Sequence, residues 1–210
     1  VMGAGDKIPE ALRQLGANVT LLTAEDLAAG DLGRFDAVVT GVRAANTRPD
    51  LLAARERVLE YVQNGGTLVV QYNTVSFRRS GPAGMLATAL APFPMTASRL
   101  RVTDERAPVG YPAGADHPLL RVPNRITRDD FEGWVQERGL YFMSAWDERY
   151  DAVLECSDKG EAPLAGGLLH ARYGKGAYVF TGYSWFRQLP AGVPGAFRLF
   201  ANLISAGKAR

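Results

Sequence analysis

The chain has 210 residues, of which 47% are hydrophobic and 22% are charged, so it can bury one substantial core. Its 24 basic and 22 acidic residues are interspersed and give a net charge of +2, which excludes the basic stripe that nucleic-acid binding needs. No apolar run approaches the roughly 18 residues that span a bilayer. We therefore expect one domain over residues 1–210, with neither nucleic acid nor a membrane as partner.

The first residues predict the last part of a strand, so we expect the sequence to begin inside that strand. Val1-Met2 lead directly into Gly3-Ala4-Gly5-Asp6, which reads as a turn. Because a buried strand normally has about five or six residues, we expect the chain to be a fragment of a longer protein. A short helix is predicted over residues 8–15 and a second strand over residues 18–22.

A complete strand–helix–strand unit follows. The apolar run at residues 37–39 predicts a buried strand, and leucines and valines recur at helical spacing over residues 49–62. Asn64-Gly65-Gly66 ends the helix, and residues 67–70 predict another buried strand. A helical crossover makes the two strands parallel, so their carboxyl ends share one edge of the sheet, where α/β proteins place their sites.

Residues 76–146 form a long excursion rich in Gly, Pro and Arg, and such a segment in a compact domain indicates a role rather than a linker. Within it we expect a short helix at residues 85–90 and a strand at 98–103. A second helix is predicted over residues 128–137, because Thr127 followed three residues later by an acid is a helix cap.

The C-terminal third reads mainly as strands with one closing helix. The strands are predicted at residues 140–144, 152–156, 164–172 and 177–182, and the helix at residues 194–205. Gly174-Lys175-Gly176 forms the turn that makes the last two strands an antiparallel hairpin.

Nucleophilic and metal-dependent chemistry lack their usual sequence signals. The chain contains no G-x-S-x-G or G-x-C-x-G elbow, and its single cysteine, Cys156, excludes a disulfide framework or a thiolate-rich zinc site. His117 stands in an Asp-His-Pro turn and His170 inside a predicted strand, so neither follows a motif that places a base. Because zinc needs three or four converging ligands, we predict no metal and no cofactor.

The polar and aromatic residues near the predicted strand ends form the candidate ligand site. Arg and Asn supply directional hydrogen bonds, and Trp and Tyr supply an apolar platform for a sugar ring. The candidates are Arg43, Asn46, Gln71, Asn73, Trp134, Glu137, Arg138, Tyr183 and Arg187. In the alternative interpretation, Trp134 and Trp185 fill the core beneath the excursion while Arg138 and Arg187 pair with nearby acids.

Long strings from Phe35 onward resemble known proteins. YVQNGGTLVVQYN and GKGAYVFTGYSWFRQLPAGVPGAFRLFANLIS are similar to noncatalytic branches of the class I glutamine amidotransferase-like superfamily. Together with GVRAANTR and NRITRDDFEGWVQERGLYF, they resemble more closely the C-terminal region of large bacterial PIG-L family deacetylases, from Phe35 onward. The resemblance implies a flavodoxin-like three-layer α/β fold with a parallel sheet, the long insertion and the C-terminal hairpin.

The resemblance also implies that catalysis lies elsewhere. PIG-L enzymes hold zinc through a His-Pro-Asp-Asp motif on a separate N-terminal domain, whereas here His117-Pro118 is followed by two leucines. Catalytic amidotransferases carry a cysteine at the elbow that here reads Gln71-Tyr72-Asn73-Thr74, and Tyr183-Ser184-Trp185 replaces the later base. The expected function is a noncatalytic accessory domain that binds carbohydrate or packs on the N-terminal deacetylase domain of the same chain.

Two other functions stay open at this point. A small-molecule hydrolase could use Glu137 as a carboxylate base. A structural dimerisation module, forming a homo-oligomer, would expose an apolar patch centred on Phe186 and Leu189. The sequence leaves the ligand, the compartment and export of the parent protein undetermined.

Overall fold

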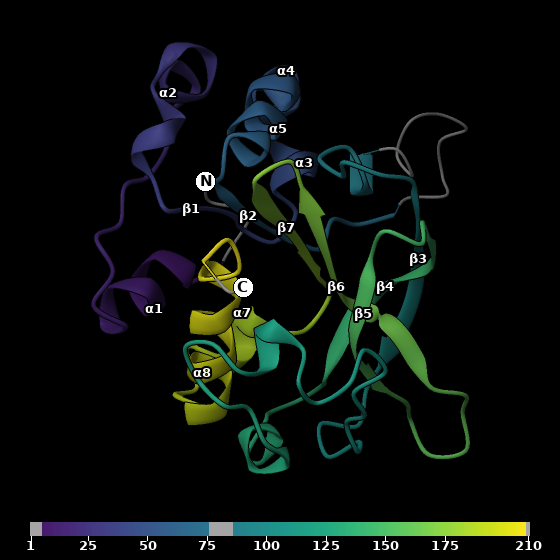
Figure 1. The fold of residues 1–210 in the computed structure, drawn as a ribbon. Helices are drawn as coiled ribbons and strands as arrows, with labels where there is room; N and C mark the ends of the chain where they lie inside the picture. The colour runs from purple at the N-terminus through teal and green to yellow at the C-terminus, as the bar shows by residue number, and fades with distance from the viewer. Residues whose placement is uncertain (1–5, 76–85, 209–210) are drawn as a thin grey trace.

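The computed structural model describes residues 6–75 and 86–208, and its centre is a five-stranded sheet (Figure 1). The strands, in spatial order, are β1 (Ala37–Thr40), β2 (Thr67–Gln71), β7 (Gly176–Thr181), β6 (Leu164–Tyr173) and β5 (Asp151–Cys156). β2 is parallel to both β1 and β7, whereas β6 is antiparallel to both β7 and β5. The predicted α/β fold, with a parallel sheet core and a C-terminal antiparallel hairpin, is confirmed.

Helices cover both faces of the sheet and create two hydrophobic clusters. The cluster on one face joins α4 (Pro49–Ala53) and α5 (Arg55–Gln63) to strand residues such as Leu68. The other cluster joins α8 (Pro194–Ile204) to strand residues such as Val69. Every residue of β2 and β7 is buried, as expected for central strands that are covered on both sides.

The remaining helical elements are short and connect or cap these layers. They are α1 (Ile8–Gln14), α2 (Ala24–Ala29), η1 (Leu32–Arg34), α3 (Ala44–Thr47), η2 (Pro118–Leu120), η3 (Arg128–Phe131) and α7 (Trp185–Gln188). Among the described residues, no helix is both long enough and apolar enough to cross a bilayer.

Part of the excursion forms a second, two-stranded antiparallel sheet. It pairs β3 (Met95–Val102) with β4 (Gly139–Trp146), and its register is interrupted by irregularities. β4 approaches β6 so closely that a Cβ at Gly166 would stand 2.0 Å from the carbonyl oxygen of Met143. The glycines of β6 therefore allow the second sheet to pack on the first. No local sequence pattern predicts this packing.

Several predicted elements differ from the structure. Residues 18–22 are irregular rather than a strand, and together with residues of β1 they line a cavity of about 650 Å³. The predicted helix over residues 128–137 is reduced to η3, although its capping box between Thr127 and Asp130 is present. The helix after β1 is interrupted at Ala54, between α4 and α5.

Two predictions fall wholly or partly outside the described residues. They are the N-terminal strand at Val1-Met2 and the beginning of the short helix at residues 85–90.

Candidate functional site

The carboxyl ends of β1, β2 and β7 lie at one edge of the sheet, because these three strands are parallel. Arg43 and Asn46 follow β1, Asn73 follows β2, and Arg187 lies on α7 after β7. The backbone N–H of Arg43 donates to the carbonyl oxygen of Tyr72 at 2.9 Å, which ties the first two strand ends together. The edge predicted from the crossover thus carries several of the predicted site residues.

The amide side chains at this edge hold the strand ends together. Gln71 is fully buried, and its Nε2 donates to the carbonyl oxygen of Thr40 at 3.1 Å. The Oδ1 atom of Asn73 accepts from Ala45 N–H at 2.8 Å. Asn46 Oδ1 likewise accepts from the N–H of Thr74 at 2.8 Å. These amides therefore shape the edge, and only Asn46 among the three is partly exposed.

Some oxygen atoms beneath the edge have no hydrogen-bond partner in the protein. They are Thr40 Oγ1, Gln71 Oε1 and Ser184 Oγ, all buried and each at or just after the end of a parallel strand. Since buried polar atoms are normally hydrogen-bonded, this edge retains unused acceptor capacity.

Trp134, Arg138 and Tyr183 lie in the protein core. The guanidinium of Arg138 donates to the carbonyl oxygen of Ala107 at 2.9 and 3.1 Å and to that of Phe131 at 2.7 Å. Trp134 donates through Nε1 to a backbone carbonyl, and the Tyr183 ring is fully buried. An exposed aromatic platform built from Trp134 and Tyr183 is therefore absent. Trp134 and Trp185 fill the core, as the alternative expects, but Arg138 bonds backbone carbonyls rather than nearby acids.

Glu137 is held by two arginines and is almost fully buried, with 4% of its side chain exposed. Its Oε2 accepts from Arg101 at 2.6 Å, and its Oε1 accepts from Arg187 at 2.9 Å. Both carboxylate oxygens are thus already bonded to arginines, and the side chain is almost fully covered, which leaves little room for a water molecule beside it. This geometry disfavours the hydrolase alternative based on Glu137.

A group of aromatic and arginine side chains at this edge, which we call the edge patch, combines the buried ring of Tyr72 with side chains that are partly or fully exposed. The ring of Tyr72 stacks on Tyr141 at 5.2 Å and meets Phe186 edge-on at 5.9 Å, and Arg187 lies over Phe186 at 4.8 Å. Burial and the negative charge of Glu137 raise the pKa of Tyr72 to about 12, while Arg187 and Arg43 oppose that shift. The patch comprises Arg43, Tyr72, Tyr141, Phe186 and Arg187.

Sequence reasoning singled out only the two arginines of this patch as ligand-binding residues. Arg43 and Tyr141 have φ angles of 60° and 56°, a left-handed conformation that side-chain-bearing residues rarely adopt. Such strain often accompanies functional sites, but it becomes visible only in the structure. Leu189 is buried, so the apolar patch expected around Phe186 and Leu189 does not extend to Leu189.

The described residues contain no activated thiol. Cys156, the single cysteine of the chain, is 3% exposed and contacts the Tyr183 hydroxyl at 3.4 Å. Burial raises the pKa of the Cys156 thiol to about 11, so it is protonated at neutral pH and unsuited to nucleophilic attack.

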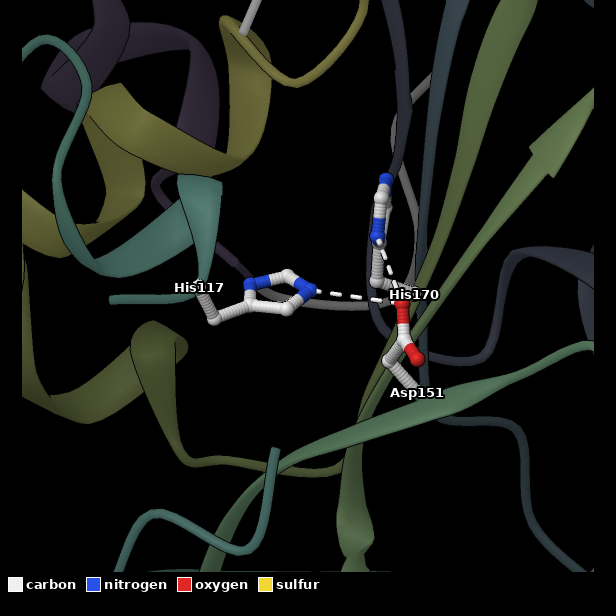
Figure 2. Close-up of side chains that lie close together, drawn as sticks. All are labelled: His117, Asp151 and His170. Carbon is white, nitrogen blue, oxygen red and sulfur yellow. Dashed lines mark ion pairs between the residues drawn. The ribbon is translucent and has the colours of Figure 1, made fainter. Parts of the chain in front are cut away.

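A second constellation, which we call the histidine cluster, consists of His117, Asp151 and His170 (Figure 2). Asp151 begins β5 and pairs in register with His170 on β6, while His117 precedes η2. Asp151 Oδ2 lies 3.5 Å from His117 Nε2 and 3.8 Å from His170 Nδ1, and the two rings meet edge-on at 5.2 Å. The fold thus brings together two histidines that no sequence motif connects.

Both imidazoles of the cluster are buried, and burial lowers both pKa values. The pKa of His170 falls to about 4, through burial and the neighbouring His117, and that of His117 also falls below its usual value. Both rings are therefore neutral near pH 7, the form in which histidine binds metal ions. Sequence reasoning missed the cluster because its signal is the β5–β6 register, which depends on irregularities in the hairpin.

Comparison with known proteins shows the fold and nothing finer. No protein-family profile and no curated protein matches the chain. Among solved structures, a putative ThuA-like protein from Bacteroides uniformis ATCC 8492 has a TM-score of 0.57 at 11% identity, covering 96% of this chain and 82% of that one. A cytoplasmic protein from Salmonella typhimurium LT2 has a TM-score of 0.53 at 17% identity, covering 94% of this chain and 84% of that one.

A longer protein also contains this arrangement. A cold-adapted β-galactosidase from Rahnella sp. R3 has a TM-score of 0.54 at 17% identity, over 95% of this chain but only 26% of that one. The chain therefore spans about a quarter of the β-galactosidase. At these identities the similarity establishes the flavodoxin-like fold alone.

Proposed function

We propose that this domain is a noncatalytic recognition module whose edge patch binds carbohydrate, as an accessory domain of a larger PIG-L type deacetylase. The observation that carries the proposal is the stack of Tyr72 and Tyr141 at the sheet edge, with Arg43 and Arg187 close to it. An aromatic face can cover the apolar side of a sugar ring, and guanidinium groups can bond its hydroxyl or carboxylate oxygens.

The chemistry of the described residues favours recognition over catalysis. The strand end that bears a cysteine in catalytic amidotransferases carries Gln71 here, and the Cys156 thiol is buried. Both oxygens of Glu137 are bound by arginines. A β-galactosidase contains the same fold as a minor part of its chain, which is consistent with an accessory domain in a carbohydrate-active protein.

The test is glycan-array binding by the wild type and by Tyr141→Ala. Removing one face of the stack should weaken binding about tenfold, since an aromatic contact contributes about 1.5 kcal/mol. The matched control is Tyr173→Ala, which removes a partly exposed tyrosine at the opposite end of the parallel strands and should bind like the wild type.

Trp134 is unsuitable as the probe because its ring is buried, so its removal would disturb the core. Equal losses in Tyr141→Ala and Tyr173→Ala, or no glycan bound by the wild type, would contradict carbohydrate recognition at the edge patch. The second result would leave packing on the deacetylase domain as the role of this surface.

A further inference from the structure

The histidine cluster has the composition and spacing of a metal site. Its two imidazole nitrogens and one carboxylate oxygen all lie within 4.8 Å of one another. In a tetrahedral zinc site with bonds of 2.0–2.1 Å, ligand atoms stand about 3.3 Å apart. Two of the present separations, 3.5 and 3.8 Å, are already close to that value, so small side-chain movements would complete the geometry.

His170 gives an independent indication that a ligand belongs here. The residue is 6% exposed, yet neither Nδ1 nor Nε2 has a hydrogen-bond partner. A buried polar group without a hydrogen-bond partner destabilises the folded state, so it is rarely retained for stability alone. The Nδ1 atom points toward Asp151, and a cation between them would satisfy it (Figure 2).

We propose that His117, Asp151 and His170 bind a divalent transition-metal ion of the zinc class. Two imidazoles and one carboxylate are a donor set that suits Zn²⁺, Co²⁺ and Ni²⁺ and is poorly matched to Ca²⁺ or Mg²⁺. The Asp151 side chain is 60% exposed, so an ion can enter from solvent and keep water in its fourth position. The site is separate from any zinc centre of a deacetylase domain, and it does not depend on the carbohydrate proposal.

Coordination requires a change of tautomer at His117. The Leu119 N–H donates to His117 Nδ1 at 3.2 Å, so in the neutral ring the proton sits on Nε2 and faces Asp151. Metal binding through Nε2 moves that proton to Nδ1 through solvent, with no net release, and breaks the bond from Leu119. The ligand bonds that the ion forms outweigh the loss of this single hydrogen bond.

One neighbouring charge opposes the ion. Arg172, two residues along β6, acts electrostatically on His170 as a positive group. Its guanidinium donates to the carbonyl oxygen of Lys175 at 2.8 Å, which directs it to the hairpin turn. We therefore expect a weaker site than a fully closed structural zinc centre.

The experiment titrates the tag-free chain, after treatment with a chelator, with ZnCl₂ by calorimetry and with CoCl₂ by visible absorption. We expect one ion per chain and the d–d bands of a nitrogen- and oxygen-ligated cobalt ion. Asp151→Asn and His170→Leu should each weaken Zn²⁺ binding about tenfold or more. Asp129→Asn, a change at an exposed aspartate on η3, should bind like the wild type.

An amide spectrum adds a readout that a nonspecific site would not give. Zinc should shift the Leu119 amide resonance in the wild type, because its bond to His117 Nδ1 is lost, and His170→Leu should need about tenfold more zinc for the same shift. The proposal fails if the wild type takes up no ion. It fails equally if both ligand variants bind as tightly as the wild type.

Discussion

Two groups of buried polar side chains in this protein differ in how their hydrogen bonds are satisfied. The first, which we call the buried polar layer, contains Glu137, Arg138, Cys156 and Tyr183, whose polar atoms are bonded within the protein. The second is the histidine cluster, where the imidazole nitrogens of His170 have no hydrogen-bond partner and the Asp151 side chain is largely exposed.

The difference separates residues that maintain the fold from residues that can still accept a ligand. When every buried polar atom of a network is hydrogen-bonded within the protein, no donor or acceptor remains for a ligand. A buried atom without a partner destabilises the fold, and a ligand that bonds it removes that cost in free energy. Four of the residues that the sequence proposed for binding, Gln71, Glu137, Arg138 and Tyr183, have bonds that serve the structure, although Gln71 keeps one free oxygen.

Removing Arg138 from the buried polar layer should destabilise the protein more than any other change considered below. Arg138→Ala leaves the carbonyl oxygens of Ala107 and Phe131 without their donor and opens a cavity. We expect the free energy of unfolding to fall by about 3–5 kcal/mol, measured by urea denaturation. The control is Arg13→Ala on the exposed face of α1, which should change stability by less than about 0.5 kcal/mol. Similar losses in the two variants would mean that the Arg138 bonds do not stabilise the fold.

A smaller effect should appear when the Cys156 thiol is titrated. Burial raises the pKa of this thiol to about 11 in the folded protein, from an ordinary value of 9.0. The unfolded chain therefore loses its proton first, so stability is intact below pH 9 and is lost as the pH rises toward 11. The loss should amount to about 2 kcal/mol at pH 11. Urea titrations at pH 8 and pH 11 should show this extra loss in the wild type relative to Cys156→Ala, and a pH-independent difference would contradict it.

The smallest changes in the free energy of unfolding are expected when either histidine of the cluster is replaced. In the presence of a chelator, His170→Leu should raise the free energy of unfolding by about 1 kcal/mol, because an unpartnered buried imidazole is removed. His117→Leu should lower it by about 1 kcal/mol, because His117 Nδ1 caps η2 by accepting from Leu119. Thermal or urea unfolding of both variants measures whether the free energy of unfolding rises or falls. A destabilised His170→Leu would show that this imidazole supports the fold.

Much of the fold follows from local sequence patterns. The apolar runs at β2 and β7, the helical spacing before Asn64 and the glycine turn after β6 each predict the element that the structure contains. The parallel edge follows as well, because a helical crossover constrains the direction of the strands. Residues 18–22 show the limit of this reasoning, since a strand also needs a hydrogen-bonded neighbour.

The candidate sites were harder to predict because exposure is a tertiary property. Trp134 and Tyr183 have the composition of a sugar platform, yet the same amphipathic rings fill a core equally well. Tyr141 belongs to a correctly predicted strand, and only its stacking on Tyr72 brings it into the edge patch.

By itself, the sequence determined the α/β class, the edge where parallel strands end and the absence of a G-x-C-x-G motif, because periodicity, turn residues and residue identity are local properties. The tertiary structure alone decided which side chains are covered and which distant ones meet. His117, Asp151 and His170 come together through the register of β5 on β6 and the packing of η2 near α8. Register and packing arise from the whole core at once, so no short stretch of the chain encodes them.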